Sequence, residues 1–110
     1  MKVDGIWKIE ILGHFGWEAV STAFLEKGRY LAASQDHYTI GQYEVSGDNI
    51  RVEAAMHRHS EAQRSPGSSK ARLVFAFEGR ITDGHISGQL DDNAGQQSIT
   101  ARGTRLGDIA

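Results

Sequence analysis

The sequence predicts an all-β protein, an eight-stranded antiparallel up-and-down β-barrel formed by residues 1–110 as a single domain. Thirteen glycines and one proline interrupt the chain at short intervals. The runs between them are short and alternate apolar with polar residues, as half-buried strands do. The connections are short enough for hairpins in sequence order, and closure into a barrel removes exposed strand edges. A two-sheet sandwich is the competing architecture.

The expected strands follow one another along the chain: Val3–Leu12, Trp17–Leu25, Arg29–Ser34, His37–Val45, Asn49–His59, Lys70–Ile81, His85–Leu90 and Gln96–Leu106. The dipeptide Asp83-Gly84 suits a two-residue type I′ turn, because both residues accept positive φ. The longest connection, Ser60–Ser69, contains Pro66-Gly67 and several serines, which predicts a mobile surface loop. A short helical turn near Ser60–Gln63 is the one departure from strand periodicity.

Alternation assigns the core faces of three strands. The predicted core residues are Trp7, Ile9 and Ile11 on the first strand, Ile50, Val52, Ala54 and Met56 on the fifth, and Leu73, Phe75 and Phe77 on the sixth. The second and fourth strands mix small and polar residues on both faces, so their phase stays open. On these strands Ser21, Ala23, Thr39 and Gly41 either line a lumen or pack beneath larger neighbours.

Composition excludes several classes of function. The net charge of -2 and the pI near 6.2 argue against a nucleic-acid binder, which needs a basic surface. The chain has no cysteine, so disulfides, thiolate catalysis and cysteine-based zinc sites are excluded. No apolar run approaches the roughly 20 residues of a membrane span, and no signal-like segment opens the chain. We therefore expect a cytoplasmic protein with no cofactor, no membrane contact and no nucleic-acid partner.

The stretch Asp4-Gly5-Ile6-Trp7, at the start of a first strand, resembles the calycin (lipocalin-type) signature. In that superfamily the tryptophan closes one end of the barrel, and an arginine from the last strand packs across its ring. The resemblance implies that Gly5 lets the chain turn tightly, that Trp7 closes the floor, and that Arg105 is its partner, with Arg102 as the alternative. Such a cation–π contact contributes about 0.5–2 kcal/mol.

A longer set of features is similar to the family of the GrlR-type negative regulator of type III secretion, whose members are short bacterial barrels. The set comprises the opening DGIW, the turn Lys27–Arg29, the span Tyr38–Val45, the turn Gly47–Ile50 and the run ending at His59. The resemblance implies a calycin-like barrel that forms homodimers, and a founding member that binds a transcriptional activator through an acidic exposed loop. This chain departs from that loop, because Ser46–Asn49 carries one acidic residue.

The histidines and glutamates are the candidates for a metal site or an enzyme active site. His57 and His59 are two residues apart and therefore lie on the same face of a strand, where they could hold a metal ion together with a third ligand from a neighbouring strand. The preferred interpretation is a solvent-facing pair of histidines, so we predict no metal site. Alternation places Glu44, Glu53 and Glu78 outside. We therefore predict no catalytic residues, and a barrel enzyme using His57 or His59 remains an alternative.

Cations gather in residues 49–72, where the local net charge is +3. The basic residues are Arg51, Arg58, Arg64, Lys70 and Arg72. They form either an ordinary solvated face or a docking patch for an acidic protein surface or an anionic ligand.

The barrel interior is the remaining candidate site. An eight-stranded barrel is either filled by its side chains or holds one small ligand. Candidate lumen residues are Ala23, Ala54, Met56, Phe75 and Phe77, and for so short a chain we expect a filled interior.

These observations favour a non-enzymatic binding or regulatory protein that acts through protein–protein contacts. We expect a homodimer, with Ala55 and either Val74 or Ala76 on its exposed contact face. A carrier or sensor of a small apolar ligand in the lumen is the alternative.

Overall fold

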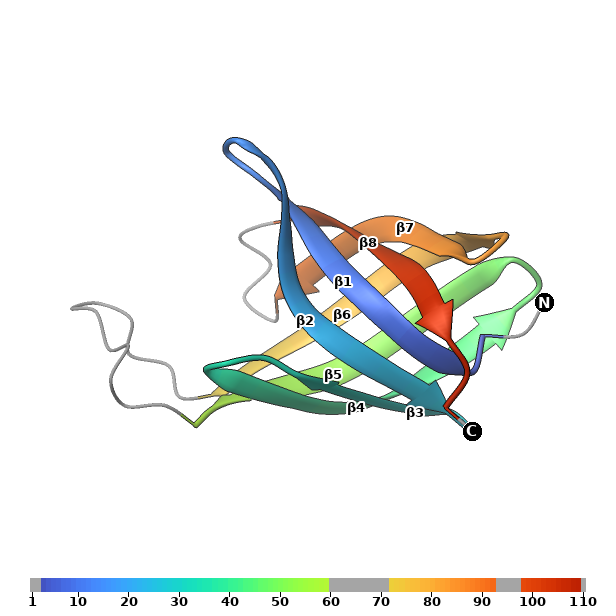
Figure 1. The fold of residues 1–110 in the computed structure, drawn as a ribbon, viewed down its shortest axis with the longest axis horizontal. Coiled ribbons are helices and arrows are strands. Elements are labelled where there is room, and N and C mark those ends of the chain that lie inside the picture. The colour runs from blue at the N-terminus through green and yellow to red at the C-terminus, as the bar shows by residue number, and fades with distance from the viewer. Residues whose placement is uncertain (1–2, 60–71, 93–97, 110) are drawn as a thin grey trace.

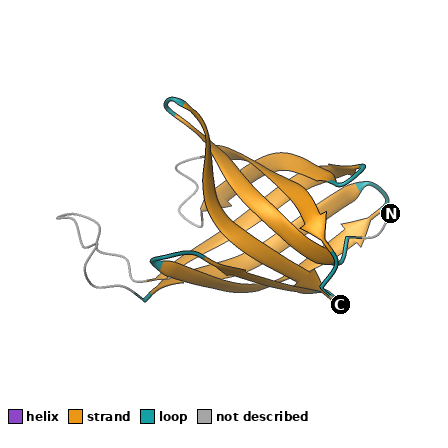
Figure 2. Cartoon of the chain, in the orientation of Figure 1, coloured by secondary structure: helices purple, strands orange, loops and turns teal. Residues whose placement is uncertain are grey.

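The computed structural model describes residues 3–59, 72–92 and 98–109, and these form eight β-strands (Figures 1 and 2). The strands are β1 (Gly5–Gly13), β2 (Gly16–Glu26), β3 (Arg29–Ala33), β4 (His37–Ser46), β5 (Asn49–Arg58), β6 (Arg72–Thr82), β7 (His85–Asp92) and β8 (Ser98–Gly107). Each lies within a few residues of its predicted range. The expected loop Ser60–Ser69 and the helical turn near Ser60–Gln63 fall outside the described residues.

The strands close into one antiparallel barrel, in which each strand pairs with its neighbour in sequence and β1 pairs with β8. The predicted up-and-down barrel is therefore confirmed, and the sandwich alternative is wrong. The turn at Asp83-Gly84 has the two positive φ values, 37° and 77°, that its sequence predicts.

Alternation places the predicted core residues inside the barrel. The buried core includes Trp7, Ile50, Val52, Ala54, Phe75 and Phe77, and Ile9, Ile11 and Met56 pack against it. Leu73, the remaining predicted core residue, also faces inward and lines the interior cavity. The assignment of faces on the first, fifth and sixth strands is confirmed.

The second strand carries an irregularity that alternation alone does not reveal. The β1–β2 register shifts between Ile9 and Glu10, so that Ile9 lies opposite Ser21 and Glu10 opposite Ala19. Val20 is the extra residue of this bulge. Because a one-residue shift exchanges the two faces of a strand, the first half of β2 has the opposite phase from its second half.

The two ends of the barrel differ. At one end, which we call the floor, three tight turns join β2 to β3, β4 to β5, and β6 to β7. At the other end, which we call the mouth, lie the β1–β2 hairpin, the β3–β4 connection, the ends of β5 and β7 and the starts of β6 and β8. Figure 1 shows the β1–β2 hairpin standing clear of the barrel wall at the mouth, while β1 begins and β8 ends at the floor.

Candidate functional site

The barrel encloses a cavity of about 620 Å³, which is the candidate functional site. It extends from Trp7 at the floor to Ser34–His37 at the mouth, and all eight strands contribute to its lining. The expectation of a filled interior is therefore wrong. Pockets for small ligands span roughly 300–1,000 Å³, so this cavity has room for one.

Small side chains on the inner face explain why so short a chain leaves this space. Inward positions on five strands are occupied by alanine or glycine: Ala23, Ala32, Gly41, Ala54 and Ala101. These residues pack the strands without extending toward the barrel axis. The larger inward side chains, such as Phe75 and Phe77, form a wall around the remaining space.

The predicted lumen residues divide into two groups. Met56, Phe75 and Phe77 line the cavity, as expected. Ala23 and Ala54 are buried in the surrounding core instead, where they are 0% and 6% exposed. The larger members of the predicted set therefore line the cavity, and the two alanines let neighbouring side chains of the core pack closely.

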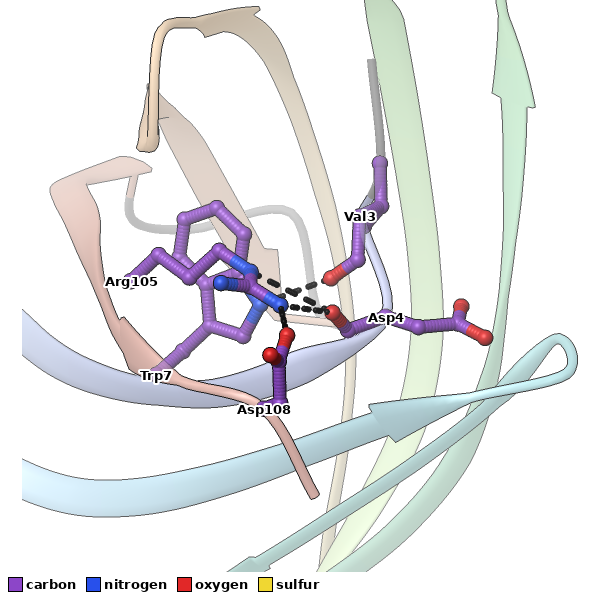
Figure 3. A network of polar contacts seen from close by, with 5 residues as sticks. All are labelled: Val3, Asp4, Trp7, Arg105 and Asp108. Atoms are coloured by element: carbon purple, nitrogen blue, oxygen red, sulfur yellow. Dashed lines mark hydrogen bonds and ion pairs between the residues drawn. The ribbon is translucent and has the colours of Figure 1, made fainter. Parts of the chain in front are cut away.

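The floor is closed by Trp7, which is 1% exposed and is the largest fully buried side chain among the described residues. Its indole Nε1 donates a hydrogen bond of 2.8 Å to the carbonyl oxygen of Val3 (Figure 3). Gly103 on β8 gives the ring its space, since a Cβ there would lie 3.3 Å from the indole Cε3. The implied role of Trp7 as the floor of the barrel agrees with this geometry.

Gly5 and Arg105 support the floor in a way that differs from the expectation. Gly5 forms no turn: it begins β1, and a Cβ there would lie 2.6 Å from the carbonyl oxygen of Gly107 and 2.8 Å from the Arg105 guanidinium. Arg105 lies beside Trp7, but its Nη2 donates to the Asp4 carbonyl oxygen at 2.8 Å and also to Asp108 (Figure 3). Arg105 therefore fastens the two chain ends together.

The cation–π contact that the structure records lies elsewhere. The Arg102 guanidinium carbon sits 3.9 Å from the ring centroid of Trp17, and Arg102 Nε donates to Glu10 Oε1 at 3.0 Å. Arg102 alternates with the buried Ala101 and Gly103, so its side chain is on the outer wall. The alternative that Arg102 partners Trp7 is wrong, because its guanidinium packs on Trp17.

Two buried tyrosines differ in their partners. Tyr43 donates a hydrogen bond of 2.6 Å to Asp4 Oδ1 near the floor. Its burial first, and then this bond, raise the pKa of Tyr43 to about 12. Burial raises the pKa of Tyr30 to about 12 as well. Tyr30 lines the cavity, and the structure records no hydrogen bond from its hydroxyl to another described residue.

Thr39 is a second buried hydroxyl in the lining. It is 7% exposed, and no hydrogen bond joins its side chain to another described residue. The register pairs Thr39 with Ala32, two residues beyond Tyr30 on the same inner face of β3. Tyr30 and Thr39 are therefore diagonal neighbours inside the barrel, a relation with Cα atoms typically about 7–8 Å apart.

The predicted basic patch does not form one surface among the described residues. Arg51 lies near the floor end of β5 and makes ion pairs with Glu53, at 3.1 Å, and with Glu78. The half-buried Arg58 lies seven residues along the same strand, or about 23 Å away. Arg72 is exposed near Arg58's end of the barrel, and Arg64 and Lys70 fall outside the described residues.

The rings of His57 and His59 both stack with the ring of Tyr38. Their centroids lie 5.0 and 6.2 Å from that of Tyr38, in stacked arrangements. Within residues 3–59, 72–92 and 98–109, no group of three metal-ligating side chains is close enough to hold an ion. Glu44, Glu53 and Glu78 are all exposed, outside the lumen.

An apolar row on the outer wall is a feature that the sequence pattern did not predict. Each member lies directly opposite the next across β1 to β6. The row, here called the outer stripe, consists of Ile6, Phe24, Leu31, Ile40, Ala55 and Val74. Phe24 is 38% and Ile40 51% exposed. The signal in the sequence is that β2 to β4 carry apolar residues on both faces.

Comparison of the chain with protein-family models gives no match, and comparison with curated proteins gives none. In the part of the chain that the structure describes, no helix is long and apolar enough to cross a membrane.

Proposed function

We propose that this chain is a non-enzymatic binding protein that holds one small apolar ligand in the barrel lumen. The observation that carries the proposal is the cavity of about 620 Å³, whose walls include Ile50, Val52, Phe75 and Phe77. Moving apolar surface from water into such walls contributes roughly 25 cal/mol per Å². The buried Trp7 closes the floor, so the ligand enters from the mouth.

The placement of acidic groups supports binding over catalysis. Glu44, Glu53 and Glu78, the carboxylates considered as general acids, lie on the outer wall. Arg51 engages two of them there. A general acid must reach the substrate atom that it protonates, and these three side chains point away from the lumen.

The test is titration of the purified protein with N-phenyl-1-naphthylamine, an apolar probe whose fluorescence rises when it leaves water. We expect saturable binding, and a loss of about tenfold in affinity in Met56→Trp, which places a larger ring in the cavity. Glu53→Trp is the matched control, because it adds the same ring on the exposed face of the same strand. Absence of saturable binding to the wild-type protein would contradict the proposal.

A second candidate function is protein–protein contact through the outer stripe, in line with the GrlR-type resemblance. Ile40 and Phe24 expose apolar surface that a solvated strand does not need. A polar row flanks the stripe on one side, where Glu26, Arg29, Gln42 and Glu53 lie opposite one another in turn. An apolar centre with a polar border is the usual anatomy of an interface, and two-fold pairing would bury the same stripe on both subunits.

Sedimentation tests this second candidate. We expect a homodimer at micromolar concentration with more than about 1,000 Å² buried in total. Ile40→Lys should give monomers, because it places a charge at the centre of the stripe. Gln89→Lys, an exposed position on β7 outside the stripe, should leave the dimer intact. A wild-type monomer up to millimolar concentration would contradict it.

A further inference from the structure

The interior of the barrel holds two buried hydroxyls without protein partners. Tyr30 is 8% and Thr39 7% exposed, and both line the cavity. Neither side chain makes a recorded hydrogen bond within residues 3–59, 72–92 and 98–109. Neither hydroxyl is among the described buried side-chain atoms that are closed off from water without a hydrogen-bond partner. Both residues border the cavity, so a polar group of a bound ligand can replace water there and hydrogen-bond to the two hydroxyls.

The other buried hydroxyl and indole groups near the cavity are satisfied. Tyr43 donates to Asp4, and the Trp7 indole donates to Val3. Both of these buried donors have protein partners, whereas the hydroxyls of Tyr30 and Thr39 in the lumen have none among the described residues. A tyrosine hydroxyl is protonated at neutral pH, and burial raises the pKa of Tyr30 further, to about 12, so the hydroxyl can donate as well as accept.

The charge of the lining argues against an ionised ligand group at this depth. Among the described lining residues, the side chains with a formal charge at neutral pH are Asp36 and Arg102. Asp36 belongs to the β3–β4 connection at the mouth. Arg102 directs its guanidinium to Glu10 and Trp17 on the outer wall. A carboxylate or ammonium beside Tyr30 would therefore be desolvated without an opposite charge, which is costly.

We propose that the lumen takes an amphipathic ligand with an uncharged hydrogen-bonding group, such as an alcohol or ketone, which Tyr30 and Thr39 bind together. This inference rests on the proposed binding function and names its ligand class. Tyr30 is the second residue after the floor turn at Lys27-Gly28, so the polar group of the ligand lies toward the floor. Its apolar body extends past Met56 and Leu73 toward the mouth.

The experiment displaces N-phenyl-1-naphthylamine from the wild-type protein with dodecanol, with dodecane and with dodecanoate. We expect dodecanol to compete about tenfold better than either of the others, since hydrogen bonds to two hydroxyls distinguish it. Tyr30→Phe and Thr39→Val should each keep probe binding and lose most of this preference. Tyr43→Phe is the matched control, because it removes a buried hydroxyl that already has a partner, and it should keep the preference.

The outcomes separate the two proposals. A wild-type protein that binds no probe would overturn the proposed binding function and this inference with it. Probe binding without a preference for dodecanol, or a preference that survives in Tyr30→Phe and Thr39→Val, would overturn this inference alone. Tighter competition by dodecanoate would also overturn it, because that result would require a cation facing the lumen.

Discussion

The floor and the mouth of this barrel are built from the same eight strands by different means. At the floor, the carbonyl oxygens of Gly28, Asp48 and Gly84 each accept a backbone hydrogen bond of 2.7–2.8 Å from Tyr43, Ile81 and Arg105, respectively. Every tight turn is thus tied to a strand beyond its own hairpin. At the mouth, the tip of the β1–β2 hairpin exposes Phe15 to 95%. The mouth has one such bond among the described residues, from the His59 amide to the Asp36 carbonyl oxygen at 2.9 Å, so this tie is present at all three floor turns and at one described connection of the mouth.

The polar side chains of the floor differ from those of the lumen in whether they have hydrogen-bond partners. Around the floor, Tyr43, Trp7 and Arg105 all have hydrogen-bond partners within the chain. In the lumen, Tyr30 and Thr39 have none among the described residues. Substitutions at the floor should therefore change the free energy of unfolding, while substitutions in the lumen should mainly change what the barrel binds.

The largest expected effect comes from Trp7→Ala at the floor. Removal of a fully buried tryptophan should lower the free energy of unfolding by about 3–5 kcal/mol, measured by urea denaturation. Phe15→Ala, at the exposed hairpin tip of the mouth, should change it by less than about 0.5 kcal/mol. A loss below about 1 kcal/mol for Trp7→Ala would remove the contrast between the two ends.

Gly5→Ala should have the next largest effect. Its φ of 152° is rare for residues with a Cβ, and the added methyl would meet the Gly107 carbonyl oxygen and the Arg105 guanidinium. Overpacking of this kind costs about 1–3 kcal/mol in the free energy of unfolding. Gly107→Ala is the control, since nothing lies within 4 Å of its added Cβ. Equal losses in the two variants would show that close packing at Gly5 is unimportant.

Alkaline pH tests the buried tyrosines of both regions. The pKa values of Tyr30 and Tyr43 are raised to about 12 in the folded chain, against about 10 for an unfolded tyrosine. The unfolded chain therefore releases these protons first. The stabilisation is fully present below about pH 10 and is lost as the pH rises toward about 12.

At about pH 11, the raised pKa of Tyr30 should have lowered the free energy of unfolding by on the order of 1 kcal/mol relative to neutral pH. Urea denaturation curves measured between about pH 9 and pH 11 should show this fall in the free energy of unfolding. Tyr30→Phe should make the free energy of unfolding depend less steeply on pH over this range. Tyr43→Phe should reduce the slope in the same direction. An unchanged slope in Tyr30→Phe would mean that this hydroxyl ionises as readily in the folded chain as in the unfolded one.

The sequence was sufficient for the barrel and for most of its inward faces. Strict alternation around Trp7, Val52 and Phe75 leaves one assignment of faces, because the opposite phase would bury Lys8 or Glu53. The Asp83-Gly84 turn was equally predictable, since few dipeptides accept two positive φ values.

The hollow lumen was not predictable in the same way. Its volume depends on how side chains from all eight walls meet at the barrel axis, and no single strand carries that information. The outer stripe was not predicted for a related reason: Phe24 and Ile40 are apolar but face outward, so alternation on β2 and β4 left the inward face of these strands undecided. The basic patch failed because residues close in sequence, such as Arg51 and Arg58, lie far apart along an extended strand.

The smallest expected effect concerns the outer wall near the mouth, where the bulge at Val20 decides the position of Trp17. Without the register shift, Trp17 would lie opposite Gly13; with it, Trp17 lies opposite Leu12 on the outer face, under the Arg102 guanidinium. A double-mutant cycle with Trp17→Ala and Arg102→Ala should give a coupling energy of about 0.5–1 kcal/mol in urea denaturation, as expected for an exposed cation–π pair. Glu10 also bonds Arg102, so the same cycle with Glu10→Gln measures the ion pair separately. Additive losses for Trp17 and Arg102 would mean that their contact contributes nothing to stability, and that the Glu10 ion pair is the contact of Arg102 that matters on this part of the wall.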